Sequence, residues 1–309
     1  MLDDFELNRP RPVFKLGRLV SVIVVAFIVF AVTSSLVTNE NFHWDMVWAN
    51  FLDPRLLRGI GYTLLLTVAA MAIGVVLAIT MAIMRQSPNP VLKSVAWFYI
   101  WFFRGTPIYT QLIFWGLLPT LYPMISLGIP LGPKLFEADI YLLWNVLTAA
   151  ILGLGLNEGA YLAEIVRAGL NSVDAGQWEA ATALGMKRGM IMRRIIIPQA
   201  MRVIVPPTGN ETISMLKTTS LVSAVPFNLE LTKAAQNMSR QDYMPVPYLI
   251  DAAIWYLLIT SILMVGQYYL EKHFGKGMAG SGSHAQPKRR VKEKDLAAAG
   301  SDSFMDVTP

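Results

Sequence analysis

The sequence predicts an all-α membrane protein with about six transmembrane helices. Of its 309 residues, 54% are hydrophobic and only 15% are charged, whereas a soluble domain has roughly 25% charged residues. The apolar residues come in stretches of ~20, the length that a helix needs to cross a bilayer. Lys and Arg are also distributed unevenly between the polar segments, which gives these stretches a consistent orientation.

The composition excludes several classes of function. There is no cysteine, so disulfides, thiolate metal sites and cysteine nucleophiles are excluded. The three histidines form no metal motif, and no nucleophile–base set can be assembled. We therefore expect neither a metal site nor a catalytic site. The net charge of +5 reports orientation and contact with anionic lipid in a membrane protein, and we do not expect nucleic-acid binding.

The first apolar stretch, 19–37, follows a basic segment, 1–18. It can be read as a signal peptide or as an uncleaved anchor, and its length without a small-residue cleavage site favours the anchor. The next segment, 38–57, has aromatic residues at helical spacing and is expected to form an extracytoplasmic interfacial helix.

A main transmembrane domain is predicted at 58–274, followed by a Gly-, Ser- and Lys-rich tail, 275–309, which is expected to be disordered. The five remaining spans are predicted at 58–84, 91–121, 140–165, 201–227 and 248–270.

Basic residues indicate which loops lie inside the cell. If both termini are cytoplasmic, the inside segments carry 18 of the 26 Lys and Arg residues, and the outside segments carry four. This asymmetry agrees with the positive-inside rule. The inside segments are 1–18, 85–93, 165–199 and 271–309, and the outside segments are 38–57, 119–139 and 228–247.

A polar segment between the fourth and fifth spans predicts a short helix at about 174–186. Asp174 can cap it, with Gln177 reaching back as in a capping box. Gly185 is well placed to end it in a left-handed conformation, and a second, basic helix is expected to run to Pro198. Physical reasoning alone supports equally a partner-docking surface and an ordinary amphipathic connector.

Polar side chains at membrane depth are costly and tend to face a pore or a partner. In the fifth span Asn210, Ser214 and Lys217 recur at helical spacing, with Glu211 and Thr218 beside them. These side chains are expected to share one face of the helix and to line a path for a solute. The alternative is that Lys217 and Glu211 form structural ion pairs.

The fourth span carries a second polar set. Asn157, Tyr161 and Glu164 recur at helical spacing, and Glu158 follows Asn157. An amide and a carboxylate at this depth can receive a zwitterion. The alternative is that the helix has already left the bilayer and that Glu164 pairs with Arg167 at i+3.

Arg104 interrupts the third span, just before Gly105, Thr106 and Pro107. It can attract a substrate carboxylate or hold a gate through a carboxylate such as Glu211. The alternative, which we favour, is a structural ion pair that fixes the kink made by Gly105 and Pro107.

The segment from Glu179 to Pro198 reads E-A-A, three residues, G, nine residues and I-x-hydrophobic-P. Further segments of a distinctive set lie at 103–107, 156–157, 160–165, 176–181, 198–200 and 216–221. On these segments the chain resembles the membrane subunits of ABC importers, within the polar amino acid uptake group, and the resemblance covers roughly 57–272. Many relatives have an acidic residue or Asn in place of Thr218, and many lack the first span.

The resemblance implies that the helix at 174–186 is a cytoplasmic coupling helix, which sits in a groove of a separate ATPase. The residues expected to make this contact are Gln177, Trp178, Glu179, Ala180, Ala181, Leu184 and Gly185. The residues expected to line the substrate path are Asn157, Glu158, Tyr161, Asn210, Glu211, Ser214, Lys217, Thr218, Arg104 and Thr106.

The resemblance also implies partners. The chain has no G-x-x-x-x-G-K-[ST] motif, so we expect ATP and Mg on the partner ATPase and no cofactor on this chain. The expected partners are a pair of ATP-binding subunits, a second permease subunit (identical or different), an extracytoplasmic solute-binding protein and membrane lipid. The expected location is the inner membrane of a bacterium, with both termini in the cytoplasm.

The expected function is that of a permease subunit importing a polar amino acid. Two other hypotheses stay open on the residues alone. One is an ion-coupled secondary amino acid transporter that uses Lys217, Glu211 and Arg104 as proton or ion groups. The other is a membrane scaffold that moves nothing.

Overall fold

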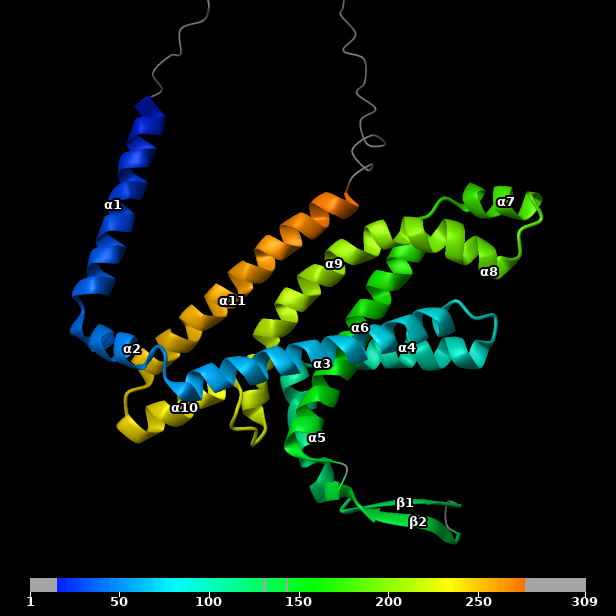
Figure 1. The fold of residues 1–309 in the computed structure, drawn as a ribbon, viewed down its shortest axis with the longest axis horizontal. Coiled ribbons are helices and arrows are strands. Elements are labelled where there is room, and N and C mark those ends of the chain that lie inside the picture. Colours follow the sequence, from blue (N-terminus) through cyan, green and yellow to red (C-terminus); the bar gives the residue numbers. More distant parts are fainter. Residues whose placement is uncertain (1–15, 130–131, 143, 276–309) are drawn as a thin grey trace, which may run out of the picture.

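The structure, a computed structural model, describes residues 16–129, 132–142 and 144–275, and the chain within these ranges is mostly helical (Figure 1). Most of the predicted terminal tails, 1–15 and 276–309, therefore lies outside the described residues. The elements are α1 (Leu16–Thr38), η1 (Glu40–Phe42), α2 (Trp44–Asn50), α3 (Pro54–Arg85), α4 (Pro90–Gly105), α5 (Ile108–Leu121), β1 (Met124–Gly128), β2 (Lys134–Asp139), η2 (Ile140–Leu142), α6 (Val146–Asn171), α7 (Ala175–Ala183), α8 (Arg188–Ile191), η3 (Met192–Ile196), α9 (Ile197–Thr218), η4 (Thr219–Ala224), α10 (Leu231–Asp242) and α11 (Pro245–Phe274).

Each of the six predicted spans contains a helix, so the predicted fold class is confirmed. Within the described residues, four helices are long and apolar enough to cross a membrane, namely α1, α3, α6 and α11. The third predicted span is two helices, because α4 ends at Gly105 and α5 begins at Ile108. The fifth is α9, which has 22 residues and carries Arg202, Glu211 and Lys217.

The segment predicted as an interfacial helix divides into shorter elements. Helix α2 ends at Asn50, and α3 begins at Pro54, four residues before the predicted boundary at 58. The Asp53 side chain accepts a hydrogen bond from the Arg55 backbone N–H at 2.8 Å and so caps α3. Hydrogen bonding to the Arg55 guanidinium lowers the pKa of Asp53. The start of α3 at Pro54 is thereby fixed.

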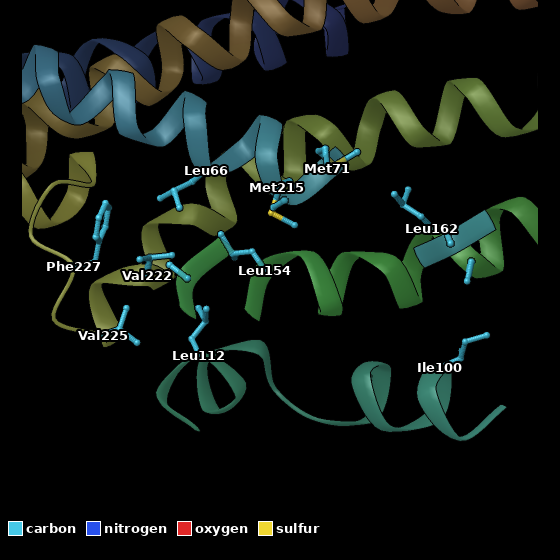
Figure 2. Packing of buried hydrophobic residues seen from close by; sticks show 14 residues of the cluster. Leu66, Met71, Ile100, Leu112, Leu154, Leu162, Met215, Val222, Val225 and Phe227 are labelled. Atoms are coloured by element: carbon cyan, nitrogen blue, oxygen red, sulfur yellow. The ribbon is translucent and has the colours of Figure 1, made fainter. Parts of the chain in front are cut away.

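The packing of α6 on α3 is the centre of the fold. Small residues let the two helices approach closely. A Cβ added to Gly155 would lie 2.9 Å from the Cβ of Ile73, and one added to Gly159 would lie 2.8 Å from the Cβ of Leu77. The main core cluster adds side chains from α5, α9 and η4 around this pair (Figure 2).

Helix α1 stands apart from this core (Figure 1). It has no buried residue, and apolar side chains such as Phe27 and Phe30 are exposed along its length. Its surface is apolar all round, as expected for a helix surrounded by lipid.

Three elements in the predicted outside loops were not anticipated. Strands β1 and β2 pair antiparallel, with Met124 opposite Asp139 and Leu127 opposite Phe136, and they project beyond α5 (Figure 1). Helix α10 fills part of the segment 228–247 and packs on α3 and α11. The hairpin is the one described departure from an all-helical chain.

The connections alternate between two sides of the helical assembly. The α3–α4 turn, α7, α8 and the end of α11 lie on one side, and α2 and α10 lie on the other (Figure 1). The polar cavity described below lies between these two sides.

Glu230 ties three of these elements together. Its buried carboxylate accepts hydrogen bonds from the Thr63 hydroxyl of α3 at 3.0 Å and from the Tyr256 hydroxyl of α11. It also accepts from the backbone N–H groups of Thr232 and Lys233, and so caps α10.

We expect Glu230→Ala to destabilise the chain by about 3 kcal/mol, because it leaves the Thr63 hydroxyl without an acceptor and two backbone N–H groups without their cap. The midpoint of thermal unfolding in detergent measures this. The control is Glu40→Ala, which removes an exposed carboxylate and should leave the midpoint within error of wild type. Equal midpoints for the two variants would contradict the role given to Glu230.

Candidate functional site

A polar cavity of about 390 Å³ lies where the end of α4, the middle of α6 and the second half of α9 meet. Eight of the ten predicted path residues line it. They are Arg104, Thr106, Asn157, Glu158, Tyr161, Glu211, Ser214 and Thr218. The predictions did not include Gly105, Pro107, Ile108 and Met215, which complete the lining.

The break between α4 and α5 forms one wall of the cavity. Pro107 has no N–H, so the carbonyl of Phe103, four residues earlier, loses its helical partner. Two side chains replace it. Asn157 Nδ2 donates to this carbonyl at 2.9 Å, and Gln111 Nε2 donates to it at 3.0 Å.

Gln111 completes a network that residue patterns did not reveal. Its amide also donates to the Thr106 hydroxyl at 2.7 Å, and its oxygen accepts from Asn157 Nδ2 at 3.2 Å. The Asn157 side chain therefore holds the α4–α5 break in place as well as lining the cavity. A lone glutamine within an apolar helix, four residues after a proline, was the available signal for this partner.

Glu158 brings a carboxylate to the cavity from α6. The residue is buried, and its Oε1 has no hydrogen-bond partner among the described residues. The side chain packs over Gly74 of α3, where an added Cβ would lie 3.0 Å from Glu158 Cγ. Glu211 of α9 brings a second carboxylate to the same cavity. The absence of a side chain at Gly74 thus makes room for an acidic group at depth.

Arg104 lies over an aromatic ring. Its guanidinium carbon is 5.3 Å from the centroid of the Tyr161 ring, within the range of a cation–π contact. The favoured expectation of an ion pair that fixes the kink is wrong for the described residues, because Arg104 has no carboxylate within 4.0 Å. The side-chain amides of Gln111 and Asn157 stabilise the break between α4 and α5. The Arg104 side chain lines the cavity.

The predicted polar face of α9 is divided between two hollows. Glu211, Ser214 and Thr218 line the polar cavity. Asn210 and Lys217 line a second hollow of about 360 Å³ between α9 and α11, to which Ser214 also contributes. The alternative of a Lys217–Glu211 ion pair is not found in the part of the chain that the structure describes.

Glu164 forms an ion pair with Arg167. Its Oε2 lies 2.6 Å from Arg167 Nη2, as the i+3 alternative predicted. This carboxylate does not line the polar cavity.

The helix predicted at 174–186 is α7, and it ends as expected. The Asp174 side chain accepts a hydrogen bond from the Gly176 backbone N–H at 2.7 Å. Gly185 has φ +72°, which glycine adopts without strain. The predicted capping box is not formed, because the Gln177 side-chain oxygen instead accepts from Gln199 Nε2 at 3.5 Å.

We call residues 174–186 the knob. Ala181 is buried and Trp178 is half-buried, and both pack with Ile191 and Ile196 beneath α7. The other five predicted contact residues are exposed. They are Gln177, Glu179, Ala180, Leu184 and Gly185. Leu184 is the most prominent, with 82% of its surface exposed.

A continuous helix leads from the knob to the cavity. Helix α8, the π-helical segment η3 and α9 follow one another without a break from Arg188 to Thr218. The predicted end of the second helix at Pro198 is therefore wrong, because Pro198 lies in the first turn of α9, where its missing N–H is tolerated. The knob is thus connected to Glu211 by one continuous helical stretch, which contains Pro206 and Pro207.

No group of His, Cys, Asp or Glu residues among those described could hold a metal ion. The lining of the polar cavity carries the charged side chains of Arg104, Glu158 and Glu211.

Comparisons with known proteins agree with this geometry. Residues 74–276 match the family described as "Binding-protein-dependent transport system inner membrane component". The arginine transport system permease protein ArgU of Corynebacterium glutamicum is 53% identical over 269 residues, which are 86% of this chain and 83% of that protein. The octopine transport system permease protein OccM of Rhizobium meliloti is 42% identical over 218 residues, 70% of this chain and 83% of that protein.

Solved structures have the same fold. An amino acid ABC transporter crystallised with histidines matches with a TM-score of 0.59 and 37% identity, over 71% of this chain and 94% of that chain. The methionine ABC transporter MetNI matches at 16% identity with a TM-score of 0.56, over 71% of this chain and 96% of that chain. The chain therefore belongs to the inner membrane components of binding-protein-dependent transport systems, and it is a membrane-spanning permease subunit of the amino acid ABC transporter type.

Proposed function

We propose that this permease carries a cationic amino acid of the arginine type through the polar cavity. The observation that supports this most strongly is the set of charges in the cavity, which are Glu158, Glu211 and Arg104. Arginine has a guanidinium, an α-ammonium and an α-carboxylate. Each of the two cavity carboxylates can bind one of the two cationic groups of arginine, and the Arg104 guanidinium can bind the α-carboxylate.

The chemistry of each pair favours recognition in a confined site. Carboxylates bind guanidinium groups through paired, charge-assisted hydrogen bonds. Glu158 Oε1 has no partner among the described residues and so has hydrogen-bonding capacity for a ligand. Arg104, held over the Tyr161 ring, is placed to meet the α-carboxylate. An acidic substrate would meet two like charges here, and Lys217 lies in the other hollow.

We propose that the energy comes from separate ATP-binding subunits that dock on the knob. The exposed Leu184 supplies an apolar contact, and the small side chain of Ala180 permits close approach. Movement of the knob would shift α9 and its Glu211 relative to α6, which is held tightly on α3. ATP and Mg would be bound by those subunits, and each ligand would bias the inward and outward populations.

The remaining partners follow from the two sides of the assembly. The knob and the end of α11 lie on one side (Figure 1), which we assign to the cytoplasm together with the start of α1. The opposite side, with α2 and α10, would receive amino acid from an extracytoplasmic solute-binding protein. A second permease subunit, identical or different, would complete the path in the inner membrane of a bacterium.

We expect Glu158→Gln and Glu211→Gln each to weaken arginine uptake by at least tenfold in vesicles that contain the intact transporter. Each substitution removes one charge that faces a cation, and a hydrogen bond to a charged group contributes about 1.5–3 kcal/mol. Uptake of radiolabelled arginine, with citrulline as the neutral competitor, is the measurement. The ratio of citrulline to arginine affinity should rise.

Glu164→Gln is the matched control, because its carboxylate pairs with Arg167 and does not line the cavity. It should leave the ratio unchanged. Equal effects of all three substitutions would contradict the assignment of the cavity. Uptake by this chain alone, abolished by a protonophore, would contradict dependence on ATP.

We expect Leu184→Asp to abolish co-purification of the ATP-binding subunits, because it places a charge in an apolar contact. Leu135→Asp is the control. Leu135 is 83% exposed, like Leu184, but it lies on β2 of the projecting hairpin. The measurement is the amount of ATP-binding subunit that co-elutes with each tagged variant. If Leu184→Asp retains as many subunits as Leu135→Asp, the knob is not the docking surface.

A further inference from the structure

A second hollow of the molecule is apolar. This groove, of about 520 Å³, is bounded by α3, α6, α9 and α11. It shares no lining residue with the polar cavity, so it is a separate feature. Residues from each helix that line it are Val75, Ile79, Val166, Ile204, Val205 and Leu270.

The lining offers no free polar group to a solute. Its only hydroxyls belong to Thr208 and Thr212. Thr208 donates to the carbonyl of Ile204 at 2.8 Å, and Thr212 donates to the carbonyl of Thr208 at 3.0 Å. Both hydroxyls are therefore used within α9. A volume of several hundred Å³ with such walls suits a hydrocarbon chain.

Four basic residues follow lining residues of the groove closely in the sequence, on the helix ends nearest the knob. Arg85, Arg193, Arg202 and Lys272 each lie one or two residues beyond a residue that lines the groove. None of them forms an ion pair within the described ranges. The acidic residue at this end, Glu271, accepts a hydrogen bond from Gln267 at 2.8 Å. Basic charge at the membrane surface attracts anionic headgroups.

We propose that the groove binds an acyl chain of an anionic phospholipid, whose headgroup phosphate lies among these basic residues. The apolar walls select a hydrocarbon chain, and the basic border selects the sign of the headgroup. The groove opens between spans, so the membrane itself supplies the ligand. Because α9 lines both this groove and the polar cavity, and on the proposed function carries Glu211 of the substrate path, a bound lipid would contact a helix of that path and so would affect transport.

The test uses the intact transporter, purified with its co-eluting subunits and stripped of lipid. Dioleoylphosphatidylglycerol or dioleoylphosphatidylcholine is then titrated in, and native mass spectrometry counts the lipids retained. Val75→Trp fills the groove. Val76→Trp is the matched control, because Val76 neighbours Val75 on α3 but does not line the groove, and it is 65% exposed against 38% for Val75.

We expect wild type and Val76→Trp to retain phosphatidylglycerol in preference to phosphatidylcholine, and Val75→Trp to lose it. Arg202→Gln and Lys272→Gln should each weaken phosphatidylglycerol binding about fivefold, the effect of one basic residue near the surface, and should leave phosphatidylcholine unchanged. These two variants also keep the test valid if Val75→Trp does not fold.

Three results would overturn the proposal. The first is equal retention of phosphatidylglycerol by Val75→Trp and Val76→Trp, and the second is equal binding of the two lipids by wild type. The third is a photo-crosslink from p-benzoylphenylalanine at Ile79 to α1 or to a second copy of the chain, which would show that protein fills the groove. A crosslink to lipid supports the proposal.

Discussion

The carbonyl of Phe103 sets the constraint on which the site depends. Pro107 deprives it of its helical donor at membrane depth, where water cannot substitute. The amides of Gln111 and Asn157 supply the missing hydrogen bonds. Because Asn157 lies on α6, satisfying this carbonyl fixes the α4–α5 break against that helix. Glu158 and Tyr161 then face the space beside the break, and Arg104 lies over the Tyr161 ring. One backbone requirement thereby determines how the charged residues of the cavity are arranged.

The two helices that carry most of the cavity differ in how they are held. Helix α6 packs closely on α3 through Gly155 and Gly159, and on α9 through Gly169. Helix α9 instead continues into η3 and α8 and so into the knob. Both walls contribute to the core, and the α9 wall is also connected to the surface proposed to receive the ATP-binding subunits. Relative motion of these walls would change the distance between Glu158 and Glu211, which is a direct way to alter the affinity for a cation.

Local sequence patterns correctly predicted features that depend on residues close together in the chain. The apolar stretches predicted the spans, and Asp174 and Gly185 predicted the ends of α7. The i+3 spacing predicted the Glu164–Arg167 ion pair. Features that depend on contacts between distant segments were missed. Gln111 reaches Asn157 across 46 positions, and the α9 residues divide between two hollows because α11 packs on one side of that helix. The two segments that form the hairpin show little alternation of apolar and polar residues, so their strands were not predicted from the sequence. The contact between Arg104 and the Tyr161 ring was also missed, because Tyr161 lies on another helix. A carboxylate partner was predicted for Arg104 instead.

The central claim is that the cavity between α4, α6 and α9 is the path of the amino acid. The chain has no cysteine, so a single Ser214→Cys in the cavity can be labelled with a membrane-impermeant, cationic methanethiosulfonate reagent in the intact transporter. Ser261→Cys on α11, outside the cavity lining, is the control. The account predicts that Cys at 214 reacts, that arginine slows its reaction, and that Cys at 261 gains no such protection. A position 214 that stays unreactive, or that reacts equally fast with and without arginine, would contradict the account.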